Sequence, residues 1–180
     1  LAYNHNAEGV EFINNKKYET VIVQAKTEIT ARTSETRIIQ PSEVYAIMLD
    51  QLNVPDKGNI FERPELVSRT RKMKFHFSFP GVTGIQKIEG TISGIFPSLI
   101  LATGKPTEDA IKLSSNTVVS FITEITDREG EANIRIFGIK DPKSANYPYS
   151  NKMNIKLYDS NNDIQQIEVD MNKTVSDILD

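Results

Sequence analysis

The chain has 180 residues, of which 38% are hydrophobic and 25% charged, a composition that is ordinary for a folded protein and excludes extended disorder. Its formal net charge is −3, so no overall positive field attracts nucleic acid or an anionic membrane surface, and we expect neither as a direct partner. Cysteine is absent, which rules out disulfides, thiolate zinc sites and a cysteine nucleophile within these residues.

One early segment, residues 37–54, fits two kinds of secondary structure. A helix would align Val44, Ile47 and Met48 along one stripe, because these positions are three and four residues apart. A strand would place Val44, Ala46 and Met48 on one face, because side chains alternate along a strand. Both alternatives stay open at the level of sequence.

Alternating hydrophobicity and β-branched residues predict strands along most of the chain. The predicted strands are residues 19–29, 66–79, 85–95, 98–104, 116–126, 131–139, 152–159 and 164–171. The last four form two predicted antiparallel hairpins through the polar turns "DREG" (127–130) and "SNND" (160–163). In the predicted strand 66–79, Phe75, Phe77 and Phe79 share the face that we expect to point into a core.

The predicted strands indicate an all-β fold with two β-sandwich domains in tandem. Residues 66–180 hold enough short strands for a sandwich in the size range of immunoglobulin-like domains. Residues 1–65 form the first domain, which is too short for an independent core and is expected to be incomplete in this chain. The tail, residues 172–180, can make one helical turn as a plug, with Thr174 and Asp177 spaced as a capping box.

Catalytic and metal-binding patterns are weak. His5 lies in a polar loop and His76 on the outward face of its strand, so a solvent-exposed side chain is favoured over a catalytic or zinc-binding role for each. Four carboxylates gather around one turn, namely Glu124, Asp127, Glu129 and Glu131. A solvated hairpin end is favoured over a glycosidase pair there, with a calcium site at residues 127–131 as a less regular alternative.

Glycines recur between residues 81 and 104 without a nucleotide-binding signature. The stretch lacks the Gly-Lys-Ser/Thr ending of a phosphate loop, and Pro106 would interrupt a helix that followed "ATGK". In a strand pattern, Gly90 and Gly94 instead indicate a bulge, a bend or the close approach of another strand. We therefore predict no cofactor.

Exposed aromatic side chains are the best candidates for a contact surface. The rings of "RTRKMKFHFSF" share a face with Met73 and are expected to be buried, which disfavours stacking on nucleic-acid bases. Tyr147 and Tyr149 lie in the Pro-containing loop "NYPYSN", and tyrosine is common in protein recognition surfaces. These two tyrosines are the predicted partner-binding residues.

One segment resembles a known family. "GIQKIEGTISGIFPSLILATGK" (84–105) is similar to a strand pair of the FimB-like accessory proteins of type V pili in Bacteroidales, a family of fimbrial anchor lipoproteins. The matching positions are Gly84, Gly90, Ser93, Gly94, Ser98, Ala102, Thr103 and Gly104. "LAYNHNAEGVEF" (1–12) and "QPSEVYA" (40–46) also look like family stretches, with Ala46 where the family pattern has glycine.

The resemblance implies two transthyretin-like sandwich domains, export as a lipoprotein and attachment to the outer membrane at the cell surface. The lipid-bearing cysteine would then lie upstream of Leu1. It further implies a non-catalytic role in anchoring or nucleating a fimbrium, or in adhesion, with pilin or other fimbrial subunits bound by strand pairing. A host or glycan ligand is a further partner that this role would allow.

Two other functions are consistent with the sequence. A carbohydrate-binding β-sandwich of an outer-membrane polysaccharide-uptake system would use Tyr147 and Tyr149 as stacking surfaces. An enzyme would need a pocket in which carboxylates converge between apolar walls. The sequence predicts no such residues, and we expect the protein not to be an enzyme.

Overall fold

A computed structural model describes residues 1–14, 16–28, 35–48, 65–143, 151–161 and 164–179. The strands are β1 (Ala2–Tyr3), β2 (Val10–Ile13), β3 (Ile22–Ala25), β4 (Thr27–Glu28), β5 (Thr36–Ile38), β6 (Tyr45–Ile47), β7 (Val67–Ser68), β8 (Arg71–Ser78), β9 (Ile85–Ser93), β10 (Ser98–Ile100), β11 (Thr117–Glu124), β12 (Glu129–Ile136), β13 (Lys152–Asp159) and β14 (Ile164–Asp170). The helical segments are η1 (Tyr18–Thr20), α1 (Glu108–Leu113), η2 (Ser114–Asn116) and α2 (Asn172–Leu179). The predicted all-β fold is confirmed.

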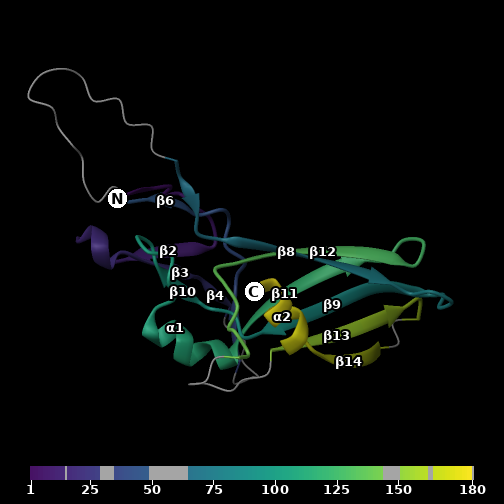
Figure 1. The fold of residues 1–180 in the computed structure, drawn as a ribbon. Coiled ribbons are helices and arrows are strands. Elements are labelled where there is room, and N and C mark those ends of the chain that lie inside the picture. The colour runs from purple at the N-terminus through teal and green to yellow at the C-terminus, as the bar shows by residue number, and fades with distance from the viewer. Residues whose placement is uncertain (15, 29–34, 49–64, 144–150, 162–163, 180) are drawn as a thin grey trace, which may run out of the picture.

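The larger layer is a six-stranded sheet in the order β14-β13-β9-β11-β5-β4 (Figure 1). Neighbouring strands are antiparallel, except that β5 runs parallel to β11. Ile88 and Ile92 of β9 and Val119 of β11 are fully buried on its inner face. The hairpin predicted around "SNND" is confirmed, because β13 and β14 pair antiparallel along most of their length.

A pair of antiparallel strands, β8 and β12, covers the inner face of this sheet. The rings of Phe75 and Phe77 stack on Phe121 of β11, with centroids 6.1 and 5.8 Å apart. Phe79 also packs against the core, so the inward face predicted for β8 is confirmed. Phe121 lies over Gly90, its cross-strand partner in β9, where a larger residue would overlap the ring. The close approach predicted at Gly90 is thus present.

The predicted hairpin around "DREG" is wrong. Asp127 and Arg128 both have positive φ, and the backbone groups of Thr126 and Glu129 exchange two hydrogen bonds of 2.9 Å, so the chain does reverse tightly here. After the reversal β12 pairs with β8 and not with β11, which lies in the facing sheet. A short turn of this kind can join strands of one sheet or of two, and the alternating pattern of both strands is compatible with either.

Strands from both sides of the predicted domain boundary at residue 65 pair with one another. β3 is antiparallel to β10, β5 is parallel to β11, and β6 is antiparallel to β7. One cluster of buried residues runs from Val10 to Val175. In the described residues, the ranges 1–65 and 66–180 therefore share three sheets and one core.

Two N-terminal predictions have clear outcomes. In the ambiguous segment, β6 is a strand and Val44 and Ala46 are both fully buried, so the strand alternative is confirmed and the helix is wrong. Residues 19–29 do not form the single strand that was predicted. Residues 18–20 are a 3-10 turn, and the chain then switches sheets between β3 and β4 at Lys26. Periodicity cannot show this switch, because it continues through the break.

The C-terminal tail packs as a helical plug, but it starts earlier than predicted. α2 begins at Asn172, whose backbone N–H donates to the Asp170 carboxylate over 2.8 Å. Thr174 therefore lies inside the helix, and the predicted capping box is wrong. Met171 and Val175 are buried against the sandwich, as expected of a plug.

α1 is a short helix that the sequence did not indicate. It starts two residues after Pro106, and its first turn is capped by the Thr107 hydroxyl, which accepts a hydrogen bond from the Ala110 N–H over 3.0 Å. A proline outside the hydrogen-bonded turns does not interrupt a helix, so the interruption expected from Pro106 is wrong.

Gln40 closes one side of the sandwich. Its side-chain amide donates to the backbone oxygen of Ser120 in β11 and accepts from the backbone N–H of Arg135 in β12, both over 3.0 Å. A single side chain thus bridges strands of the two layers that do not pair directly.

Candidate functional site

The six-stranded sheet ends in an exposed strand, β14. All seven of its residues are exposed, and it pairs only with β13 among the described strands. Ile167 and Val169 lie opposite Ile155 and Met153 in the pairing register, so they belong to the inner face of the sheet. They are nevertheless 43% and 37% exposed, whereas their partners in β13 are buried. The inner face of the sheet is therefore buried at β13 and partly exposed to solvent at β14.

β8 offers a second edge. In the described structure it pairs with β12 on one side and with no strand on the other. Its outward side chains are polar, and two of them are engaged across the pair, with Lys74 Nζ 2.7 Å from Glu131 and His76 Nε2 2.6 Å from Glu129. The Lys74 ammonium holds the pKa of the Glu131 carboxyl below its usual range. Unpaired N–H and C=O groups on such an edge can accept an extended segment of another chain.

The Lys74–Glu131 and His76–Glu129 contacts show how two of the clustered carboxylates and one histidine are engaged. Glu129 and Glu131 lie across the strand pair from His76 and Lys74 on an exposed surface, and His5 is exposed at the N-terminal end. Within the described ranges, no group of three or more His, Asp or Glu side chains is placed to hold a metal ion. Glu129 and Glu131 thus lie on a solvated strand surface, where each is paired with a side chain of β8.

Tyr147 and Tyr149, the predicted partner-binding residues, fall within 144–150 and lie outside the described residues. Their role as a contact surface stays a prediction.

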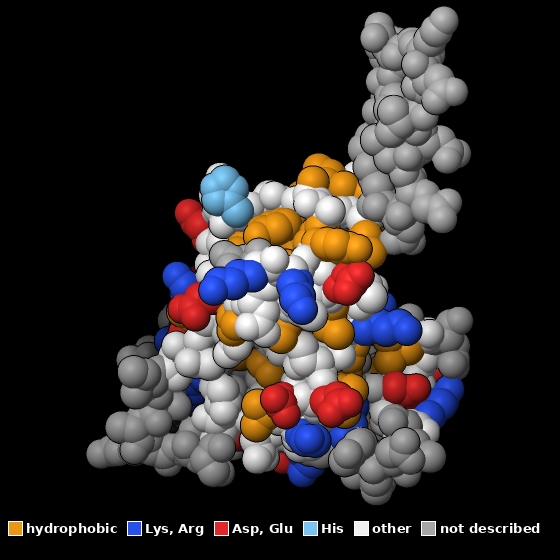
Figure 2. Space-filling view, turned by 90° about the vertical axis from the view of Figure 1, so that its left-hand side faces the viewer, with side chains coloured by type: hydrophobic (Ala, Val, Ile, Leu, Met, Phe, Trp, Pro, Cys, Tyr) orange, Lys and Arg blue, Asp and Glu red, His pale blue; other side chains and the backbone are white. Residues whose placement is uncertain are grey.

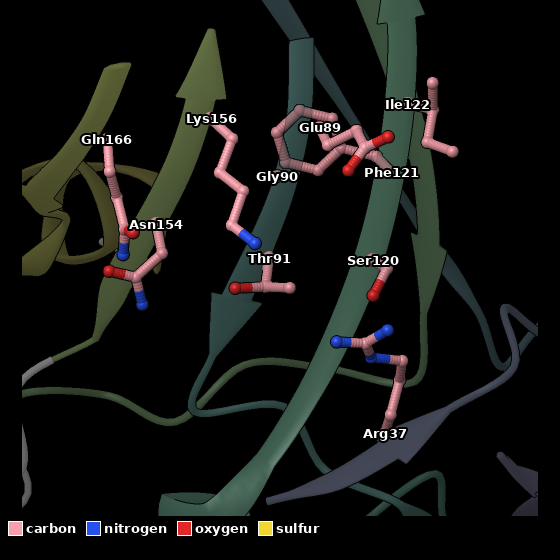
Figure 3. A pocket seen from close by; sticks show the side chains of 10 residues that line it. All are labelled: Arg37, Glu89, Gly90, Thr91, Ser120, Phe121, Ile122, Asn154, Lys156 and Gln166. Atoms are coloured by element: carbon pink, nitrogen blue, oxygen red, sulfur yellow. The ribbon is translucent and has the colours of Figure 1, made fainter. Parts of the chain in front are cut away.

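The outer face of the six-stranded sheet carries a cavity of about 250 Å³, which we call the polar hollow (Figure 3). Its floor is a row of short side chains on three adjacent strands, because Ser120 pairs with Thr91 and Thr91 with Asn154. Longer side chains border this row, with Arg37 of β5 at one end and Lys156 of β13 toward the other. The remaining lining residues are Glu89, Gly90, Phe121, Ile122 and Gln166.

The acidic residue of the polar hollow is already compensated. Glu89 accepts hydrogen bonds from Lys87 Nζ over 2.9 Å and from the Tyr158 hydroxyl over 2.7 Å. The Lys87 bond, followed by the Tyr158 bond, holds the pKa of Glu89 below its usual range, and the same contact raises the pKa of Lys87. Lys87 also lies 4.2 Å above the Tyr158 ring.

Two buried polar atoms of the polar hollow lack partners. Neither Arg37 Nε nor Ser120 Oγ has a hydrogen-bond partner among the described atoms, and both are shielded from solvent. Arg37 Nε has Glu28 as its nearest carboxylate, at 3.9 Å, which is beyond hydrogen-bond distance. Buried donors and acceptors in native proteins are usually paired, so these two atoms set the polar hollow apart from the rest of the described outer face.

Sequence reasoning did not identify the polar hollow. Most of its lining residues are outward positions of five strands, and most of these are ordinary polar side chains on a solvated sheet face. They come together only through the strand order, which periodicity within one strand cannot give.

Charge elsewhere is mixed. Figure 2 shows the end of the molecule that lies on the left in Figure 1, and acidic and basic side chains are interspersed on it, with no continuous patch of either sign. No helix in the described ranges is long and apolar enough to cross a membrane.

Comparison with known proteins gives a fold relationship. No protein-family model matches this chain, and no curated protein matches it. The chain is similar to a crystal structure from Bacteroides ovatus, described as that of a proposed adhesin, with a TM-score of 0.66 and 16% sequence identity. The likeness covers 97% of this chain and 65% of that one, so this chain spans about two thirds of the neighbour's length. At this level of identity, the likeness shows that the two chains share their fold.

Proposed function

We propose that this protein is a non-catalytic accessory, anchor or adhesion subunit at the cell surface, and that it joins fimbrial subunits by β-strand pairing. The observation that carries the proposal is β14, an edge strand whose seven residues are all exposed and whose inner-face residues Ile167 and Val169 lack the cover that their partners in β13 have. An added strand would pair with the free backbone groups and bury these side chains.

The energetics favour such a partner. Burying an aliphatic side chain completely is worth about 1.5–3 kcal/mol, so covering two that are 37–43% exposed would add about 1–2 kcal/mol to the backbone hydrogen bonds. An exposed edge with apolar side chains also invites aggregation, and proteins generally protect such edges unless they are used. The outer face of β8 carries the Lys74–Glu131 pair and that of β14 the Lys152–Glu168 pair, but β14 also keeps Ile164, Ile167 and Val169 exposed.

Two further lines support a surface role. The structural neighbour is described as a proposed adhesin from Bacteroides ovatus, and the motifs of residues 84–105 resemble Bacteroidales fimbrial anchor proteins. With this role we propose export as a lipoprotein and attachment to the outer membrane through a lipid anchor upstream of Leu1. The alternative of a polysaccharide-uptake protein rests on Tyr147 and Tyr149, which the described structure does not include.

Site-specific crosslinking tests the proposal. A photoreactive p-benzoylphenylalanine is placed at Ile167 in the full-length protein, expressed in fimbriated Bacteroidales cells, and the crosslinked products are identified by mass spectrometry. The matched control carries the same group at Leu113, an exposed apolar residue of α1 with 53% exposure. We expect fimbrial subunits to be crosslinked from position 167 at several times the yield from position 113.

A second substitution tests the mechanism. Ile167→Lys adds a charge to the inner face of β14 and should reduce incorporation into fimbriae without lowering the melting temperature, because residue 167 is already 43% exposed. Equal crosslinking from positions 167 and 113, or normal incorporation of the folded Ile167→Lys protein, would show that β14 is not the assembly surface.

A further inference from the structure

We propose that the polar hollow binds a carboxylate-bearing sugar, such as a uronic acid residue of an acidic glycan. This site lies on the outer face of the six-stranded sheet, so it is separate from the inner-face residues of β14 proposed for assembly. It would give the protein a ligand-binding activity in addition to subunit pairing.

The charges of the polar hollow select an anion. The lining holds two cationic residues, Arg37 and Lys156, and one acidic residue, Glu89, which lies opposite Lys156 in the strand register. Glu89 also accepts a hydrogen bond from Lys87, which lies outside the lining, so the cavity keeps an excess of positive charge. In Figure 3 both side chains extend toward the hydroxyl groups of the floor. Arg37 is one-third exposed, and among the described residues its guanidinium has only a long ion pair, 3.9 Å from Nε to Glu28. A ligand carboxylate between the two cations would gain charge-assisted hydrogen bonds.

The floor selects a ligand with many hydroxyl groups. Thr91 and Ser120 present hydroxyls, and Asn154 and Gln166 present amides, each of which can donate and accept. Ser120 Oγ has no partner among the described atoms but is shielded from solvent, so a ligand would reach this hydroxyl only after the neighbouring side chains move. Ile122, which is 66% exposed at the border, provides an apolar contact for the C–H face of a sugar ring.

An acidic peptide fits the polar hollow less well. Peptides are usually recognised through backbone pairing at a sheet edge or through apolar pockets. Here β9, β11 and β13 are interior strands that pair on both sides, so the floor offers no free backbone edge. The recognition groups are almost all side-chain hydroxyls, amides and cations, which suits a saccharide.

The cavity is small and shallow, so we expect a dissociation constant in the millimolar range, about −4 kcal/mol. Binding is measured by ¹H–¹⁵N correlation spectra of the protein titrated to about 50 mM with sodium glucuronate, at constant ionic strength. Glucose is the neutral counterpart with the same ring, and N-acetylaspartate N-methylamide represents an acidic peptide side chain. We expect saturable shifts of the Thr91, Ser120 and Asn154 amides with glucuronate alone.

Matched variants locate the carboxylate. Lys156→Gln and Arg37→Gln should each weaken glucuronate binding about tenfold, the loss typical of one charged hydrogen bond. Lys152→Gln is the control, because Lys152 lies on the same strand and outer face but pairs with Glu168 outside the lining. The proposal would be overturned if glucose gave shifts equal to those with glucuronate, or if the aspartate compound gave equal or larger shifts. It would also be overturned if glucuronate gave no saturable shift at these amides, or if Lys152→Gln weakened glucuronate binding as much as Lys156→Gln does.

Discussion

Gly90→Ala is expected to destabilise the protein through a single ring. The backbone of Gly90 has ordinary strand geometry, since it is absent from the described residues with positive φ, so alanine is sterically allowed there by the backbone itself. Replacing a strand glycine by alanine would then stabilise by about 0.5–1 kcal/mol through backbone entropy. Instead, the new methyl group would overlap three carbon atoms at the tip of the Phe121 ring.

The size of the effect follows from what Phe121 touches. The ring is 5% exposed and stacks with both Phe75 and Phe77 at interplanar angles of 12° and 19°, so it cannot move away from Gly90 without disturbing the contact between the two layers. Overpacking a well-filled core typically costs about 1–3 kcal/mol, which outweighs the entropic gain. We expect Gly90→Ala to lower the free energy of unfolding by about 1–2 kcal/mol.

A double-mutant cycle isolates the cause. Phe121→Leu removes the ring-tip atoms that the alanine methyl would meet and should cost about 1–2 kcal/mol alone, less than the roughly 3–5 kcal/mol of a Phe→Ala change. In that background Gly90→Ala should be neutral or stabilising. Urea unfolding of the four proteins, followed by circular dichroism, gives the coupling energy. A Gly90→Ala cost that is equal in the Phe121→Leu background and in the wild type would refute the ring as the cause.

Two further changes test the bridge between the layers and the outer-face ion pair. Gln40→Leu removes both hydrogen bonds that link β11 and β12 and leaves two backbone groups without their partner. We therefore expect the free energy of unfolding, measured in urea, to fall by about 1–3 kcal/mol and the Arg135 amide to exchange faster. Unchanged exchange at Arg135 would contradict the bridge. Glu89→Gln tests how protonation of Glu89 is coupled to the stability of the fold. Because the pKa of Glu89 is held below 4.5 in the folded state, its ionised form stabilises the fold above that pH. This contribution is lost as the pH falls through the folded-state pKa. The difference in unfolding free energy between Glu89→Gln and the wild type should therefore be largest near pH 7 and shrink toward pH 3, and a constant difference would argue against it.

The sequence predicted the strands well where local pattern is sufficient. Alternation in residues 66–79 indicated the inward face of β8, and the short polar turn at 160–163 indicated the β13–β14 hairpin. The glycine at position 90 indicated a bulge, a bend or a close approach, and the structure shows the close approach, although sequence could not name the ring that occupies the space. These features depend on residues within one strand or on one turn.

Pairing between distant strands could not be predicted in the same way. The turn at 127–130 is as tight as a hairpin, yet β12 joins the facing layer, and the choice depends on contacts with β8 more than 50 residues earlier in the chain. The polar hollow was missed for the same reason. Its cations come from Arg37 and Lys156, which are brought to one cavity only by the strand order.

The parallel pairing of β5 with β11 also constrains how the chain folds. Thr36 lies opposite Thr117, so 81 positions separate two residues (117 − 36) that must meet before this part of the sheet can close. Such non-local pairing slows folding, because loop-closure entropy is lost before the contact is gained. During synthesis, β4 and β5 have to wait until β11 has emerged before they can dock onto the sheet. We therefore expect closure of this sheet to be a late, rate-determining event, and fragments that end before residue 117 to expose the edge of β5 that pairs with β11.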